Sequence, residues 1–444
     1  MTHYSHIKRQ DKKIYEAIMR EEARQASGLE LIPSENIVSL AVREAMGSCL
    51  TNKYSEGYPH ARYYGGNEVI DIVEDIARDR AKKLFGVAHV NVQPYSGSPA
   101  NLAVYLATCK PGDTIMGHLL TAGGHLTHGW KASATSMFYN AVQYGVRPDG
   151  YLDLEQIASL AKKHKPKLIW VGATAYVREF PFKELSKIAD SVGAYLAADI
   201  AHIAGLVAAG AHASPVPYAH IVTTTTHKTL RGPRGGMIMV TAKGLKKDPE
   251  LAEKVDRAIF PNLQGGPHDH TTAGIAVALA EAATPTFRAY GKQIVKNARA
   301  LAATLVSRGV DVVTGGTDNH MILVKCGTGR GAILEIALDA IGLTTNKNTI
   351  PDEPSSPFYP SGIRIGTPSI TTRLMKEREM KRIGNWIADV MDITKDEDLP
   401  ADKSARKPYL ASFKKRAYKN RKLMTMRKEV AQLCKKFPIP ERFV

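Results

Sequence analysis

Cysteine is scarce in this chain of 444 residues, and its four cysteines are far apart. Cys49, Cys109, Cys326 and Cys434 form no CxxC pair and no other spacing typical of metal ligands. The sequence therefore predicts neither a disulfide framework nor a zinc site. This cysteine usage fits the reducing conditions of a cytoplasm.

Long uncharged apolar runs are also missing. The longest apolar stretch, residues 192–211, contains Asp199 and His202 near its middle. A charged group is costly inside a bilayer, so we predict that this stretch lies in a buried α/β core and not in a membrane. The first nine residues show no apolar segment of a signal peptide, and we expect a cytoplasmic protein.

Acidic residues are few compared with basic ones, with 43 Asp and Glu against 60 Lys and Arg and a net charge of +17. Residues 401–444 alone hold 14 Lys and Arg against three Asp and Glu, a net charge of +11. Such a tail can contact nucleic acid or another anionic surface. We favour a solvated helix face, because no aromatic-interleaved RNA-binding motif is present and apolar residues recur at helical spacing. These apolar residues are Leu410, Phe413, Ala417, Leu423 and Met426.

The chain is long enough for two or three domains. After helical patterns at 10–27 and 70–85, strand and helix signals alternate, which is typical of a mainly parallel sheet with helices on both faces. The predicted strands are 90–92, 114–116, 168–171, 194–198, 221–224 and 237–240. A long helix at 290–306 then leads to strands at 310–313 and 321–324, which predict a smaller C-terminal domain. Ligands of such sheets bind at the carboxyl ends of the strands.

A lysine after a β-branched strand is the strongest functional signal. Four threonines at 223–226 precede His227 and Lys228, and a glycine-rich bend follows. Burial lowers the pKa of a lysine and frees its amine to form a Schiff base. Asp199 ends another apolar strand, and a strand-end aspartate with a downstream lysine is what pyridoxal phosphate needs. The acid keeps the ring nitrogen protonated and the lysine holds the aldehyde.

Two glycine-containing loops are candidates for the same site. We predict that Ser98 caps a helix whose first residue is Pro99, and Gly97 would let a phosphate approach the free backbone N–H groups; such junctions are more often only caps. His125 either stacks on the pyridine ring or is a surface histidine in a turn. His128 lies three residues further on, but no carboxylate or cysteine lies beside the two histidines in the sequence, so we reject a metal site there.

Glu56 and Arg364 are the remaining candidates. Glu56 lies in a loop dense in tyrosine, glycine and proline, and it can donate a proton if burial raises its pKa. Arg364 lies in an apolar strand bounded by glycines. An inward arginine needs an anion, which is either a substrate carboxylate or a structural ion-pair partner.

These motifs resemble those of serine hydroxymethyltransferase, a fold-type I pyridoxal-phosphate enzyme, from about residue 31 to residue 368. The resemblance rests on LIPSEN at 31–36, EGYP at 56–59, RYYGG at 62–66, QGGP at 264–267, NKNTIP at 346–351 and the segments of Asp199, Lys228 and Arg364. It implies an α/β fold with a mainly parallel seven-stranded sheet between helices. It also implies a helical arm at 1–30, a large cofactor-binding domain at 31–285 and a small α/β domain with the basic tail at 286–444.

The resemblance implies reversible conversion of L-serine and tetrahydrofolate to glycine and 5,10-methylenetetrahydrofolate through an aldimine of pyridoxal phosphate on Lys228. Thr225 would lie beside this aldimine, and His125 would stack on the ring whose nitrogen pairs with Asp199. The other implied cofactor contacts are Gly97, Ser98, Thr174 and His202, with Tyr54 and Gly266 from a second subunit. The implied carboxylate-binding residues are Ser34, His202 and Arg364.

The resemblance further implies that Glu56 of the partner subunit handles protons, so that the protein is an obligate homodimer. The sequence does not decide between a dimer and a tetramer. The implied folate contacts are Tyr64, Leu120, Gly124, Leu126 and Asn348. Several positions depart from the family pattern: Ala122 replaces a common histidine, Asn262 a usual glycine and Thr174 a usual serine, and His268 is atypical. These departures bear on folate binding more than on the pyridoxal chemistry.

The alternative function is that of a folate-independent aldolase, such as a threonine aldolase. That enzyme would need Lys228, Asp199 and Arg364 but no folate pocket. The Tyr63-Tyr64 pair and Asn348 argue against it.

Overall fold

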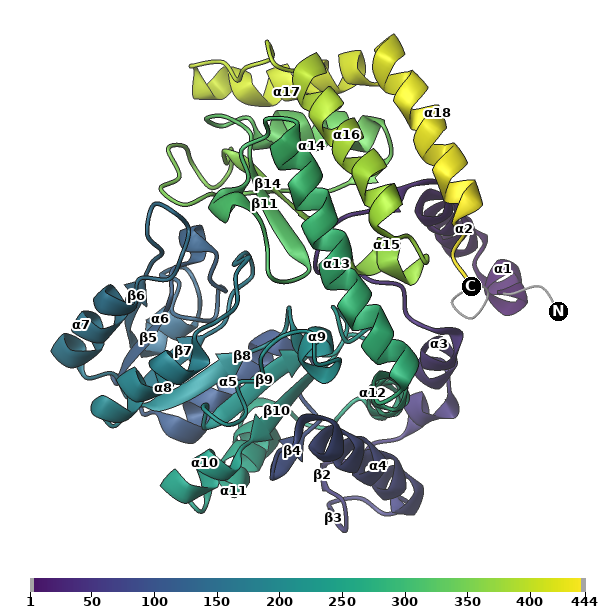
Figure 1. The fold of residues 1–444 in the computed structure, drawn as a ribbon. Coiled ribbons are helices and arrows are strands. Elements are labelled where there is room, and N and C mark those ends of the chain that lie inside the picture. Colours follow the sequence, from purple (N-terminus) through teal and green to yellow (C-terminus); the bar gives the residue numbers. More distant parts are fainter. Residues whose placement is uncertain (1–3, 441–444) are drawn as a thin grey trace.

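A seven-stranded sheet forms the middle layer of the lower half of the computed structural model, which describes residues 4–440 (Figure 1). The strand order is β4–β10–β9–β8–β7–β5–β6. The strands are β4 (His89–Asn91), β5 (Thr114–His118), β6 (Asn140–Tyr144), β7 (Leu168–Val171), β8 (Tyr195–Asp199), β9 (Ile221–Thr225) and β10 (Gly236–Val240). Positions 1–3 and 441–444 of the predicted arm and tail lie outside the described residues.

The sheet is mainly parallel, as predicted. Strands β6, β5, β7, β8 and β9 run parallel, and β10 alone is antiparallel to both of its neighbours, β9 and β4. The pattern analysis did not find β6, which is an edge strand with only Tyr144 buried, so its apolar alternation is weak.

Alternate residues of each strand enter two different cores, as the period of a strand requires. Leu196 and Ala198 of β8 join one core with helices on one face of the sheet, and Ala197 between them joins the core on the other face. The helices of the first face are α4 (Glu68–Phe85), α7 (Leu154–His164), α8 (Phe182–Ser191), α9 (Ala204–Ala208) and α12 (Asp269–Ala282), and those of the second are α5 (Gly97–Thr108) and α11 (Leu251–Arg257).

Helix α13 (Pro285–Ser307) connects this layered structure to a second hydrophobic core. Its Ile294 belongs to the core of the large sheet, whereas Leu301 and Leu305 belong to the second core. The second core surrounds an antiparallel sheet, β11–β14–β13. Its elements are β11 (Met321–Lys325), α14 (Gly331–Ala340), β12 (Leu343–Thr344), β13 (Asn346–Asn348), β14 (Gly362–Gly366), α15 (Pro368–Thr372) and α16 (Glu377–Ile393).

The predicted strand at 310–313 is wrong. Val312 forms only an isolated bridge with Val324, and a 3-10 turn begins at Val313. Thr314 adopts the left-handed φ of 60°, which ends any extended segment there.

The basic tail forms two helices, α17 (Lys403–Ala417) and α18 (Arg421–Lys436), which pack on the second core. Phe413, Ala417, Leu423 and Met426 are buried there, and Leu410 is half-buried. The predicted apolar face is therefore confirmed. Among residues 4–440, no helix has the length and apolar character needed to cross a bilayer.

Residues 12–30 lie beside this second core, whereas the helix at 40–46 lies beside α12 (Figure 1). Strand β1 (Leu29–Glu30) pairs in parallel with β12.

The other elements of the chain are α1 (Ser5–Gln10), α2 (Lys12–Ser27), α3 (Leu40–Met46), β2 (Gly57–Tyr58), β3 (Ala61–Arg62), α6 (Thr135–Phe138) and α10 (Ala242–Lys247), with 3-10 or π turns at Cys49–Asn52, Leu120–Ala122, Ala258–Leu263 and Val313–Gly315.

Candidate active site

Two neighbouring parallel strands bring Asp199 and Lys228 to the same edge of the sheet. Asp199 is the last residue of β8 and lies opposite Thr223 of β9. Lys228 follows three residues after the end of β9. Because the carboxyl ends of parallel strands meet at one edge, this is where an α/β sheet binds its ligands.

Three donors hold the carboxylate of Asp199. Its Oδ2 accepts hydrogen bonds from Asn101 Nδ2 at 2.9 Å and from His128 Nε2 at 3.2 Å, and its Oδ1 accepts one from the backbone N–H of Ala201 at 3.0 Å. Burial by itself would raise the pKa of Asp199, but His128, His125 and Asn101 outweigh it and place this pKa well below its usual range. The aspartate is therefore ionised at neutral pH.

Asn101 and His128 were missed as functional residues by the sequence analysis. Thr223 Oγ1 donates to Asn101 Oδ1 at 2.7 Å, which orients the amide toward Asp199. The ring of His128 stacks on Trp170, with ring centres 5.1 Å apart and planes 9° apart. Each of the two residues follows a loop that was already a candidate in the sequence: Asn101 follows the loop at Gly97, and His128 follows the loop at Gly123 and Gly124. This position was the signal that could have identified them.

The sequence-based reason for rejecting a metal site does not hold in three dimensions. The fold places the carboxylate of Asp199 beside His125 and His128, with the possible ligand atoms within 4.8 Å of one another. In the structure these groups are bonded differently, because His128 Nε2 pairs with Asp199 and His125 Nδ1 lies 2.7 Å from Thr127 Oγ1. Burial lowers the pKa of His125 to about 4, so its imidazole is neutral at neutral pH.

The amine of Lys228 forms no hydrogen bond or ion pair within residues 4–440. Burial lowers its pKa to about 8; the charge of Asp199 opposes this shift, and Arg364 and Arg234 add to it. The backbone carbonyl of Lys228 accepts a hydrogen bond from Asn36 Nδ2 at 3.1 Å, which fixes the segment that carries the side chain. A partly neutral, unpaired amine is suited to covalent chemistry.

Helix α5 begins at Gly97 and not at Pro99, so the predicted N-cap at Ser98 is wrong. Ser96 is the N-cap, and Ser98 lies in the first turn. Proline is tolerated in this turn because its backbone N–H would have no partner inside the helix. A Cβ on Gly97 would lie 2.8 Å from Thr225 Cγ2, so only glycine allows the loop to approach the strand that leads to Lys228.

Arg364 of β14 is buried and pairs with no carboxylate in the described part of the chain. Its Nε donates to Asn346 Oδ1 at 3.2 Å, and its Nη1 donates to the carbonyl of Thr174. Burial lowers the pKa of Arg364 to about 10. The structural ion pair that the sequence left open is therefore not formed, and the guanidinium remains available for a ligand anion.

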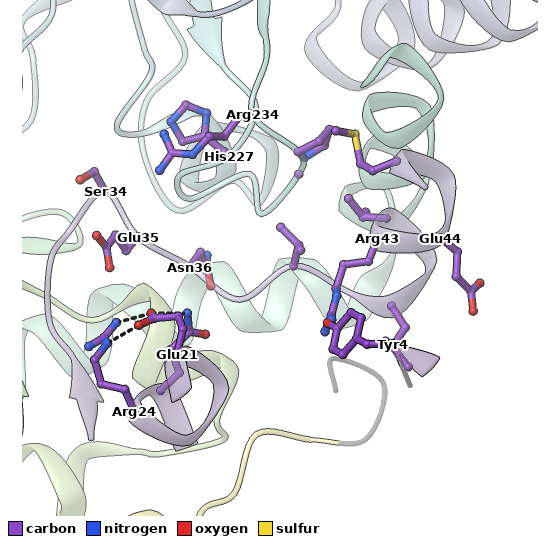
Figure 2. A pocket seen from close by; sticks show the side chains of 17 residues that line it. Tyr4, Glu21, Arg24, Ser34, Glu35, Asn36, Arg43, Glu44, His227 and Arg234 are labelled. Atoms are coloured by element: carbon purple, nitrogen blue, oxygen red, sulfur yellow. Dashed lines mark hydrogen bonds and ion pairs between the residues drawn. The ribbon is translucent and has the colours of Figure 1, made fainter. Parts of the chain in front are cut away.

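A cavity of about 850 Å³ lies next to the segment that carries Lys228; its lining includes His227 but not Lys228, Asp199 or Arg364 (Figure 2). Ser34 and Asn36 border it on one side, and His227 and Arg234 face it from the other. Three buried atoms near Lys228 have no hydrogen-bond partner within residues 4–440: Thr225 Oγ1, His202 Nε2 and His227 Nδ1. Buried polar atoms are nearly always bonded, so this cluster indicates a place for a polar ligand.

Tyr54, Glu56 and Gly266 form a separate group. A Cβ on Gly265 would lie 3.2 Å from Glu56 Oε1, and one on Gly266 would lie 3.2 Å from the ring of Tyr54. In the described part of the chain, no hydrogen bond or ion pair joins this group to Lys228 or Asp199. Tyr64 belongs to the same group, because its ring centre lies 5.3 Å from that of Tyr54.

The other predicted folate contacts lie on two segments that approach each other. Leu120 is in the turn that leads to Gly124, and a Cβ on Gly124 would lie 2.0 Å from the carbonyl of His118, so only glycine fits. Thr174 donates its N–H to the carbonyl of Gly123 at 2.7 Å. Residues 121–122 and 349–351 line one small cavity, which places Asn348, at the end of β13, near this loop. Leu126 is half-exposed.

A buried ion-pair network holds the segment of Tyr54 and Glu56. Arg62 contacts Asp71 at 2.9 Å and Glu74 at 2.8 Å, and it donates to the carbonyls of Ser55 and Gly57. The side chains of Arg62 and Glu74 are each only 3% exposed. The stability of this segment therefore depends on the pairing of Arg62 with the two carboxylates, because a buried charge without a partner is strongly destabilising.

We expect Arg62→Met to lower the free energy of unfolding by about 3–5 kcal/mol, because it leaves the Glu74 carboxylate buried without its cation. Urea titration followed by circular dichroism measures the change. Glu74→Gln added to Arg62→Met should restore part of the loss. Arg147→Met is the control, since the Arg147–Asp149 pair is about half-exposed and should contribute no measurable stability. Equal midpoints for the Arg62 and Arg147 variants would contradict the assignment.

Comparison with known proteins gives consistent matches over almost the whole chain. The sequence model of the family described as serine hydroxymethyltransferase matches residues 7–387. A serine hydroxymethyltransferase of Sorangium cellulosum (strain So ce56) is 54% identical over 434 residues, which cover 97% of this chain and 95% of that protein. One of Acidothermus cellulolyticus (strain ATCC 43068 / DSM 8971 / 11B) is 52% identical, covering 97% of this chain and 96% of that protein.

Proposed function

We infer from its membership of the serine hydroxymethyltransferase family that this chain is a pyridoxal-phosphate-dependent transferase, which converts L-serine and tetrahydrofolate reversibly to glycine and 5,10-methylenetetrahydrofolate. The observation that carries the assignment to particular residues is the unpaired Lys228 amine beside an ionised Asp199 and a buried Arg364 without a carboxylate. The family match favours this activity over the folate-independent aldolase.

The residues present fit pyridoxal phosphate. An aromatic ring nitrogen would meet the carboxylate of Asp199, and a phosphate would meet the loop and first helical turn at Gly97 and Ser98. The partnerless Thr225 Oγ1 and His202 Nε2 provide polar contacts for oxygen atoms of the cofactor or substrate. We propose that these residues, with His125 against the ring and Thr174 beside it, hold the cofactor on Lys228.

When bound, pyridoxal phosphate supplies an electron sink for the bonds that break at the α-carbon of the amino acid. Asp199 remains negative and so keeps a protonated ring nitrogen in place. Arg364, with Ser34 and His202, orients the amino acid through its carboxylate. The Lys228 amine, with a pKa of about 8, accepts or releases a proton near neutral pH. The folate would contact Tyr64, Leu120, Gly124, Leu126 and Asn348.

We propose that two copies of the chain share each active site, in a cytoplasmic homodimer. Val69, Ile72 and Ile76 form an exposed apolar stripe on α4, with exposed fractions of 63%, 58% and 39%, and Ile14 on α2 is 53% exposed. Apolar patches of this kind mark interfaces. A second copy would cover them and carry its Tyr54, Glu56 and Gly266 toward the cavity beside Ser34 and Arg234.

A mixing experiment tests the shared site. Glu56→Gln and Lys228→Ala should each be inactive alone, whereas refolding the two together should regain about a quarter of the wild-type activity, because half of the random dimers contain one site without either substitution. Refolding each variant by itself is the control. No recovery from the mixture, with dimers present by size-exclusion chromatography, would show that Glu56 acts within its own chain.

The pH dependence of cofactor attachment follows from the pKa of Lys228. The neutral amine is the nucleophile, so below pH 8 the rate of covalent uptake by the cofactor-free protein should rise about tenfold per pH unit, and it should level off above. Visible absorbance after rapid mixing measures this rate. The same reaction of the cofactor with Nα-acetyl-lysine, compared per neutral ε-amine, corrects for ionisation of the cofactor itself. A corrected midpoint at the ordinary lysine value of 10.5 would refute the lowered pKa.

The function itself is tested with the purified protein loaded with pyridoxal phosphate. Serine should be cleaved to glycine at a rate that depends on tetrahydrofolate, with one methylenetetrahydrofolate formed for each glycine. Equal rates with and without the folate would instead indicate an aldolase.

A further inference from the structure

A second buried histidine lies directly behind His202. His202 follows β8 in the turn before α9, next to Ile203 of the first core, and His320 immediately precedes β11, whose Ile322 belongs to the second core. His202 Nδ1 and His320 Nε2 are 3.3 Å apart, and the ring centres are 5.5 Å apart. Both side chains are buried, with His202 4% and His320 0% exposed.

Both rings are neutral. Burial lowers the pKa of each well below the ordinary value, and the cations Lys228 and Arg364 lower both further. A neutral imidazole has one N–H donor and one acceptor nitrogen. The single contact between the rings therefore has only two arrangements: either His320 Nε2–H donates to His202 Nδ1, or His202 Nδ1–H donates to His320 Nε2.

The outer nitrogens distinguish the two arrangements. His320 Nδ1 and His202 Nε2 are buried and have no partner within residues 4–440. If His202 donated, His320 Nδ1 would carry an N–H with no acceptor, and such orphaned donors are rarer in proteins than under-used acceptors. His202 Nε2 would then direct a lone pair at the anionic oxygens that Arg364 and Lys228 attract, which is repulsive.

If His320 donates, the unpartnered N–H lies instead on His202 Nε2, which is close to Lys228 and Arg364, where an oxygen of the ligand can accept it. His320 Nδ1 is then a bare acceptor, and His202 Nε2 carries a proton that it can donate to an oxygen of the ligand. The backbone of His202 is fixed as well, because its carbonyl accepts a hydrogen bond from Thr229 Oγ1 at 2.8 Å, in the residue after Lys228.

We propose that His320 is a positioning residue, which holds His202 in the tautomer whose Nε2–H donates to an anionic oxygen of the bound amino acid or cofactor. This proposal rests on the proposed function for the identity of the ligand, because an oxygen of the ligand supplies the acceptor that distinguishes the two tautomers. It gives a role in ligand binding to a residue that lies just before β11 and 118 positions from His202 in the sequence.

Nitrogen-15 NMR of histidine-labelled protein that is loaded with pyridoxal phosphate and glycine tests the tautomer. We expect His202 to show a protonated Nε2 and a bare Nδ1, with signals assigned by their loss in His202→Gln. A protonated Nδ1 on His202 would overturn the proposal. Addition of pyridoxal phosphate, and then glycine, should move the Nε2 signal at the step that supplies its acceptor, which distinguishes a cofactor oxygen from the substrate carboxylate.

Substitution of His320 gives a second test. A glutamine side-chain N–H can replace the Nε2–H donor, whereas phenylalanine keeps the ring but cannot donate. We expect His320→Phe to weaken the binding of glycine to the loaded protein about tenfold, the loss of one hydrogen bond to a charged group, and His320→Gln to restore most of it. His212→Phe and His212→Gln are controls for a neighbouring buried histidine outside the proposed contact.

The outcomes separate the two claims. Equal glycine affinities of His320→Phe and His320→Gln, both folded by circular dichroism, would overturn the positioning role. If neither variant folds, the NMR measurement on the wild-type protein decides. Failure of the wild-type protein to bind pyridoxal phosphate or to cleave serine would refute the proposed function, whereas a protonated Nδ1 on His202 in the loaded protein would refute the positioning role alone.

Discussion

Replacing Lys228 with alanine is expected to reduce serine cleavage by at least about 1,000-fold, because it removes the nucleophilic amine of the site. The amine has no bonded partner within the described residues, so its loss breaks no hydrogen bond or ion pair there. The variant should therefore unfold at the same temperature as the cofactor-free wild-type protein. Steady-state kinetics with serine and tetrahydrofolate measure the activity, and visible absorbance measures covalent cofactor attachment.

Lys243→Ala is the matched control for this prediction. Lys243 is another partly buried lysine, on α10 and away from the site. Its Nζ pairs with Asp190 of α8 at 2.7 Å. Its removal should leave kcat within about twofold of the wild-type value. If Lys228→Ala kept more than about a tenth of the wild-type kcat, covalent attachment at this residue would be excluded as a requirement of the reaction.

Asp199→Asn is the second substitution with a large expected effect. Asparagine keeps the size of the side chain, but it carries no negative charge to hold a protonated ring nitrogen. Its single oxygen can keep the contacts of Oδ2 with Asn101 and His128, while its NH2 group would face the N–H of Ala201. We expect kcat to fall by about 1,000-fold. We also expect the cofactor-free protein to unfold at a lower temperature, because the N–H of Ala201 loses its acceptor. A loss of less than about tenfold would show that the charge of Asp199 is not needed.

His128→Gln provides a graded comparison with Asp199→Asn. His128 lowers the pKa of Asp199, so its removal should raise that pKa toward the ordinary value of 3.8. Asp199 would still be ionised at neutral pH, so kcat at pH 7 should fall far less in His128→Gln than in Asp199→Asn. Equal losses of kcat in the two variants would show that His128 acts by more than its effect on the pKa of Asp199.

Much of the fold was predictable because its signals are local. Strands β7, β8, β9 and β10 were found within one or two residues, since each is a short apolar run that is buried on both faces. The edge strand β6 and the segment at 310–313 were not, because partial exposure weakens the pattern of the first and a left-handed residue interrupts the second.

The sequence by itself determined the chemistry of the site, because the reactive residues lie in, or directly after, apolar strands. Lys228 and Asp199 were identifiable because each follows or ends an apolar strand, and parallel strands present such residues at one edge. The buried Arg364 was identifiable for a similar reason, as the one charge in an apolar strand, although its lack of a carboxylate partner became known only from the fold.

Only the tertiary structure decided which side chains set the properties of these residues. Asn101 and His128 reach Asp199 across 98 and 71 positions of the chain, and His320 reaches His202 across 118. Such contacts depend on strand order and on how the second core packs against the sheet, neither of which is contained in a local pattern. The periods of helices and strands specify which face of an element is buried, but not which distant element covers it.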